Sequence, residues 1–119
     1  MLGHHLARTI HVPGALAADV VPALTIPQNC RLVHVSAVAL NDSDATLMLG
    51  TPANPAGILA PAPIGRGGVP AVFTARDWAP ANPTGRLRAG DVLLITLDFD
   101  GDSGAAARDV TVDLDFLEG

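Results

Sequence analysis

The sequence predicts an all-β fold, a two-sheet antiparallel β-sandwich or jelly roll of about seven or eight strands. Apolar and polar residues alternate strictly from Val110 to Phe116, which is the period-two pattern of a strand with one buried face. Turn-forming residues separate such segments roughly every 8–12 residues, the spacing typical of sandwiches and barrels. Ten prolines and twelve glycines disfavour long helices. We expect an N-terminal arm at residues 1–6 and a single sandwich domain at residues 7–119, because 119 residues suffice for one domain.

The closing segment, residues 90–118, is predicted to be a hairpin around which the remaining strands pack. Residues 91–99 are nearly all apolar and rich in strand-forming types. Residues 100–104, Asp-Gly-Asp-Ser-Gly, have the chemistry of a turn. The side chains expected on the buried face of the last strand are Val110, Val112, Leu114 and Phe116.

The other strands follow from the same patterns, taken in chain order. The expected segments are residues 7–12, 20–26, 31–40, 45–49, 57–61 and 69–75. Pro22 places the second of them at a sheet edge, because proline has no N–H to donate. The strand at residues 31–40 is apolar on both faces and is therefore expected to be central, with Leu32, His34 and Ser36 on one side. Residues 50–68 are predicted to be largely irregular.

Composition narrows the classes of partner. The net charge is −5 and basic residues form no run, which disfavours nucleic-acid binding. No apolar run approaches the roughly 20 residues of a membrane span. The lone Cys30 excludes an intrachain disulfide and a cysteine-based zinc cluster. The N-terminus lacks a signal-peptide pattern, which predicts synthesis in the cytoplasm.

Two groups of residues are candidate metal ligands. Asp98, Asp100, Asp102 and Asp109 occupy positions 1, 3, 5 and 12 of an EF-hand-like spacing. The sixth position is Ser rather than Gly and no helices flank the loop, so we favour a solvated turn. A cupin-like site on His11 and His34 is the second possibility, and a surface His11 with a half-buried, hydrogen-bonded His34 is preferred. No metal or cofactor is therefore predicted.

No arrangement of nucleophile and base supports an enzyme. Cys30 and His34 would lie about 13 Å apart along a strand. The remaining interpretation is a binding or structural module. Trp78, in a proline-flanked loop, is a candidate interface anchor, or equally a cover for the open end of the sandwich. Leu2 and Leu6 belong to the arm, which either reaches a neighbouring subunit or frays.

Most of the chain resembles small head-decoration (cement) proteins of tailed bacteriophages. The similar segments are residues 26–37, 41–47, 64–65, 90–93 and 109–114. The resemblance implies a jelly-roll homotrimer on the outer surface of the virion, bound to the major capsid protein and without catalytic residues. No lasso-like long arm is evident, so the mode of clamping stays open. The alternatives are a carbohydrate-binding jelly roll, in which Trp78 would be the sole candidate platform, and a cupin-like metal protein.

Overall fold

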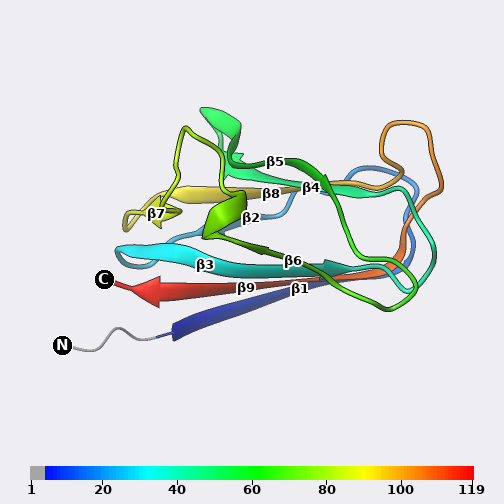
Figure 1. Ribbon diagram of the computed structural model, residues 1–119, viewed down its shortest axis with the longest axis horizontal. Helices are drawn as coiled ribbons and strands as arrows, with labels where there is room; N and C mark the ends of the chain where they lie inside the picture. The colour runs from blue at the N-terminus through cyan, green and yellow to red at the C-terminus, as the bar shows by residue number, and fades with distance from the viewer. Residues whose placement is uncertain (1–4) are drawn as a thin grey trace.

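A computed structural model describes residues 5–119 as two antiparallel sheets packed face to face (Figure 1). The predicted β-sandwich is confirmed, with nine strands where seven or eight were expected. The first sheet has the order β1-β9-β3-β6, and its strands are β1 (His5–Ala15), β9 (Arg108–Glu118), β3 (Cys30–Val38) and β6 (Ala71–Thr74), with the short β7 (Arg86–Leu87) also paired to β3. The second sheet has the order β2-β8-β4-β5, and its strands are β2 (Ala23–Thr25), β8 (Val92–Asp98), β4 (Thr46–Thr51) and β5 (Asn54–Pro63). One short 3-10 helix, η1 (Ala75–Asp77), follows β6.

The strand pairs are nested. β4 pairs with β5, β3 with β6, β2 with β8, and β1 with β9, all antiparallel. The chain is therefore one long antiparallel ribbon that folds over on itself, which is the jelly-roll arrangement. Because each successive pair lies in the opposite sheet, both strands of a pair cross from one layer to the other together.

The predicted hairpin of β8 and β9 is wrong, because these two strands lie in different sheets. The segment between them, residues 99–107, crosses between the layers beside the link that joins β1 to β2. Leu16 N donates to Ala107 O at 3.0 Å, and Phe99 N donates to Asp19 Oδ1 at 3.2 Å. The turn chemistry of residues 100–104 therefore shapes a corner of the ribbon instead of reversing a strand.

The core lies between the sheets and is almost entirely aliphatic. All four residues expected on the buried face of β9 are buried, and Asp113 on the opposite face is exposed. In β8 the alternation is equally regular, with Leu93, Ile95 and Leu97 at most 2% exposed. Burial of such side chains contributes about 25 cal/mol per Å² of apolar surface. The alternation thus shows that each strand has one buried face. β8 and β9 line the same core from opposite sheets.

The expectation for β3 is corrected at His34, which is exposed and not half-buried. A β-bulge between Leu32 and His34 inserts one extra residue, Val33, opposite β9. The bulge reverses which residues face inward, so that Leu32 and then Val35 are buried. β3 is internal to its sheet, as its two apolar faces indicated.

The middle of the chain is more regular than its composition suggested. Residues 54–63, within the segment predicted to be largely irregular, form β5, a strand with three prolines. β5 is an edge of the second sheet, where a missing N–H removes no ladder bond on the open side. β2 is the other edge, as Pro22 predicted. Within the described residues, no helix is long and apolar enough to cross a membrane.

The first strand begins at His5, two residues before the expected start of the sandwich at residue 7. Leu6 consequently pairs with Phe116 in the register of β1 and β9. Leu2 lies outside the described residues.

Candidate functional site

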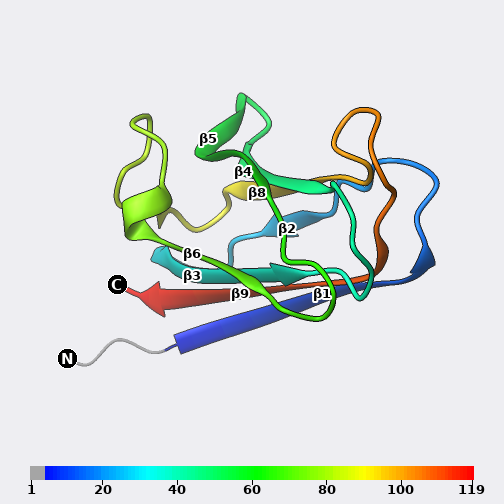
Figure 2. The same cartoon turned by 45° about the vertical axis from the view of Figure 1, so that its right-hand side comes forward.

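The flank between β1 and β2 is the first candidate site. β1 and β2 are edge strands of different sheets, and within residues 5–119 no further strand pairs with the open edge of either (Figure 2). Apolar side chains lie half-buried there, in contact with the core. We define the β1–β2 flank by Leu6, Ile10, Leu16, Val20 and Leu24. Partly exposed aliphatic side chains on an edge can bury further area against another chain.

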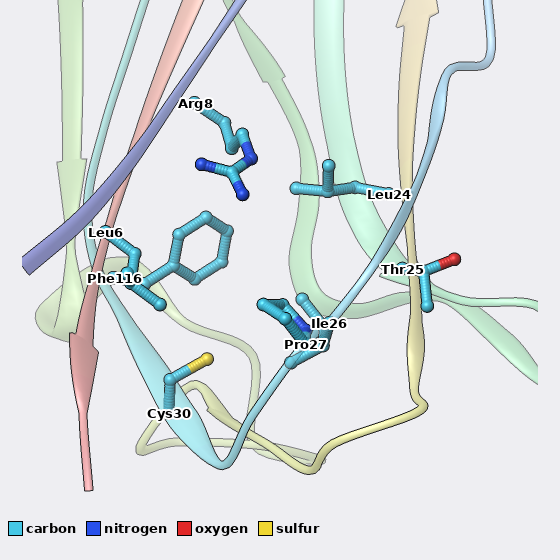
Figure 3. Close-up of a pocket in the computed structure, with 8 residues that line it drawn as sticks. All are labelled: Leu6, Arg8, Leu24, Thr25, Ile26, Pro27, Cys30 and Phe116. Carbon is cyan, nitrogen blue, oxygen red and sulfur yellow. The ribbon is translucent and has the colours of Figure 1, made fainter.

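A small apolar pocket opens at the end of this flank that carries Leu6 and Leu24 (Figure 3). Leu6 and Leu24 line it from the two edge strands, and Phe116 and Cys30 lie deeper. Its free volume is about 10 Å³, which is the space of a single water molecule. Burial raises the pKa of the Cys30 thiol, so the thiol stays protonated near neutral pH. The pocket suits the packing of a partner's methyl group better than the binding of a separate small molecule.

Arg8 is the one charged side chain in the inward-facing row of β1. Figure 3 shows its guanidinium beside the Phe116 ring, and both side chains line the pocket. Its Nη1 donates to the Ala7 carbonyl at 3.0 Å, and within residues 5–119 it forms no ion pair. An inward-pointing charge on an edge strand disfavours continuous addition of another strand. A partner would therefore meet this flank through side chains.

Three of the four aspartates considered as calcium ligands accept hydrogen bonds from backbone N–H groups, and Asp100 Oδ1 does so from Asp102 N at 2.9 Å. Asp98 Oδ1 accepts from the N–H groups of Asp100 and Asp102 at 3.4 and 3.3 Å. Asp109 Oδ1 instead accepts from Gly14 N at 2.7 Å, in the neighbouring strand β1. These bonds are typical of aspartates that stabilise turns.

His5, His11 and His34, the histidines of the described chain, lie on the outer face of the first sheet. His11 Nδ1 lies 2.9 Å from Thr111 Oγ1, and His5 Nδ1 lies 3.1 Å from Asp115 Oδ1. His11 and His34 stand on β1 and β3, with β9 between them. Over the part of the chain that the structure describes, no three His, Cys, Asp or Glu side chains are grouped so that they could hold a metal ion.

The Trp78 side chain is buried at one end of the sandwich, and its role as an interface anchor stays a prediction. Its side chain is 7% exposed, and its Nε1 donates to the Leu32 carbonyl at 3.0 Å. Gly85, with φ of 67°, lets the loop backbone pass close to the indole ring. A buried ring offers no open face on which a sugar could stack.

Sequence reasoning singled out Leu6 but missed the rest of the flank. The alternation Leu6-Arg8-Ile10-Val12 marks the inward row of β1 and could have indicated a charge at a core-facing position. Leu24 carries no such signal, because β2 has only three residues.

No family model matches this chain, and no curated protein matches its sequence. Among solved structures, it is similar to a chain of the cyanophage Pam1 capsid asymmetric unit. The alignment covers 99% of this chain and 87% of that chain, with a TM-score of 0.57 and 12% sequence identity. At this identity the likeness shows a shared fold over the whole length of the sandwich.

Proposed function

We propose that this protein is a capsid decoration (cement) protein of a bacteriophage. It binds the outer surface of the head as a homotrimer, contacts the major capsid protein, stabilises the lattice and catalyses no reaction. The observation that carries the proposal is the whole-chain likeness to a chain of a phage capsid asymmetric unit. The segments that resemble cement proteins support it independently, because they were identified from the sequence.

Decoration needs no catalytic group, and its energetics follow from mass action. A protein that binds only the assembled shell stabilises that shell by RT ln(1 + [L]/Kd). A trimer can engage three neighbouring subunits at once, so modest contacts at each site combine into stable attachment. A rigid sandwich with an aliphatic core suits this role, because its surface is presented without ordering a flexible chain.

Co-sedimentation with shells tests the proposal directly. We expect the purified protein to pellet with mature capsids of its own phage and to remain in solution with unassembled major capsid protein. The capsids should then withstand higher temperature, measured by release of their DNA. Failure to bind mature capsids, with unchanged thermal release, would contradict the decoration role.

The β1–β2 flank is proposed as the contact between copies in the homotrimer. A cyclic trimer buries one patch of each copy against a different patch of the next. The flank offers partly exposed aliphatic side chains that already contact the core and would be buried further against a second copy. Leu6 is one of them. A second copy is favoured because β1 is an 11-residue edge strand that presents Leu6 and Ile10 on either side of Arg8, which is long enough for an extended contact.

Leu6→Gln is therefore expected to shift the trimer toward monomer at micromolar concentration, measured by light scattering after gel filtration. The loss of apolar burial at three equivalent contacts should weaken assembly at least about tenfold. Ala7→Gln is the matched control, because Ala7 is exposed on the outward row of the same strand. Equal oligomeric states in both variants and the wild type would place the contact elsewhere.

A further inference from the structure

Four arginines gather at the end of the sandwich where β3 begins. They come from the first residues of β3, from η1, from β7 and from the turn after β7, all at the same end of the molecule (Figure 1). The members of this arginine end are Arg31, Arg76, Arg86 and Arg88. All four are exposed, and none forms an ion pair within residues 5–119.

Two of these arginines oppose each other across a strand pair. Arg31 on β3 and Arg86 on β7 are partners in the antiparallel register. Their neighbours Cys30 and Leu87 are 1% exposed, so both arginines point outward on the same face. Like charges in this position repel each other and destabilise the pair. The free protein therefore holds an unfavourable arrangement that an acidic partner would relieve.

The acidic groups nearby accept hydrogen bonds from backbone or amide N–H groups, and none of them forms an ion pair with the arginine end within residues 5–119. Asp77 Oδ2 accepts from Thr74 N and Asp91 Oδ2 accepts from Arg88 N, each at 2.9 Å. Glu118 accepts from the side-chain amide of Gln28. The guanidinium groups of the arginine end thus lack carboxylate partners inside the described chain, although their ordinary partners in proteins are carboxylates and phosphates.

An open cleft of about 340 Å³ adjoins the Arg31–Arg86 pair. Its lining residues are Arg31, Leu32, Val33, Ala75, Pro83 and Thr84. The lining is mostly apolar, and Arg31 is its one charged residue. Such a site fits an acidic side chain next to an apolar one, which a protein segment supplies and a nucleic-acid backbone does not. The net charge of −5 also opposes a long phosphate chain.

We propose that the arginine end is a docking surface for an acidic segment of a protein partner. Carboxylates of the segment bridge Arg31 and Arg86, while an apolar side chain enters the cleft between Val33 and Pro83. This inference stands on the arginine arrangement and the adjoining cleft, and does not depend on the proposed decoration role. The test of this inference uses no capsid. The inference can therefore fail while the decoration role holds, and the decoration role can fail while the inference holds.

Titration of the 15N-labelled protein with short poly-L-glutamate at low ionic strength provides the test. We expect chemical-shift changes centred on the arginine end, and about tenfold weaker binding by Arg31→Gln/Arg86→Gln. Arg66→Gln/Arg108→Gln is the matched control with the same charge change. Those arginines pair with Asp42 at 3.0 Å and Asp109 at 3.4 Å, so binding should stay as in the wild type.

Three results would overturn the inference. They are retained binding by Arg31→Gln/Arg86→Gln, an equal loss in the control, and shift changes centred elsewhere. Tighter binding of an oligothymidylate of equal charge at the same residues would identify a phosphate site and overturn the choice of a protein partner.

Thermal unfolding gives a second, ligand-free readout. Arg86→Gln alone is expected to raise Tm by about 1–4 °C, because it removes the cross-strand repulsion. The backbone groups of Arg86, which bond Asn82 at 3.0 and 3.2 Å, are unaffected by the substitution. A lower Tm would show that the Arg86 side chain supports the fold, and would remove the argument for a partner.

Discussion

Trp78→Ala is expected to lower the free energy of unfolding by about 3–5 kcal/mol, the range for truncating a buried large aromatic side chain. The indole is 7% exposed and closes one end of the core, so its removal leaves a cavity beneath the loop of residues 79–85. Urea unfolding followed by far-UV circular dichroism measures the loss, because Trp78 is the sole tryptophan and the variant has no indole fluorescence.

Trp78→Phe separates the two contributions of this side chain. It keeps an aromatic ring in place but removes the N–H, and so leaves the Leu32 carbonyl without its donor at 3.0 Å. An unsatisfied buried acceptor costs about 1–3 kcal/mol, so the phenylalanine variant should lie between wild type and alanine. A loss below about 1 kcal/mol for Trp78→Ala, with weakened capsid binding, would instead support an interface anchor.

The role of Trp78 could not be predicted because its partner is remote in sequence. The acceptor is a backbone carbonyl 46 residues earlier, at the bulge of β3. A proline-flanked loop has the same local pattern whether its tryptophan points inward or outward. That pattern therefore left two interpretations open, and the burial of the ring depends on the tertiary arrangement.

Strand identity was predictable where one face is buried, and strand pairing was not. The alternation from Val110 to Phe116 is a local property, and burial follows it residue by residue. The pairing of β9 with β1 joins segments a hundred residues apart, and a turn between β8 and β9 is equally compatible with a hairpin and with a corner. Turn chemistry specifies a change of direction and leaves the partner strand undefined.

Which side chains of β3 face outward depends on one inserted residue. Counting by twos from Leu32 places His34 with the buried set, and the bulge at Val33 reverses that assignment. The arginine end was missed for a related reason. Arg31 and Arg86 lie far apart in the chain, and only the register of β3 and β7 brings them face to face.

Gly65→Ala is expected to cost about 3 kcal/mol, the upper end of the usual cost of overpacking, since a Cβ at this position would overlap backbone and not a movable side chain. The nearest atoms are the Val69 carbonyl oxygen and, at 2.6 Å, the Ala71 nitrogen. Gly65 also joins the link between β5 and β6 to the end of β3 through two backbone hydrogen bonds. Its N–H donates to Ala37 O, and its carbonyl accepts from Ala39 N, both at 2.9 Å.

Gly67→Ala is the matched control two residues away. Gly67 has φ of 61°, and a methyl group added there would meet nothing within 4 Å, so its substitution carries only the left-handed backbone cost of about 1–2 kcal/mol. Chemical denaturation of both variants measures the difference. Equal losses of unfolding free energy in the two variants would mean that the link shifts to accommodate a methyl group. The close approach of Gly65 to Val69 and Ala71 would then not be needed to hold β6 against β3. A larger loss for Gly65→Ala would show that this crossing of the ribbon is rigid, because the only added group is one methyl in contact with main chain.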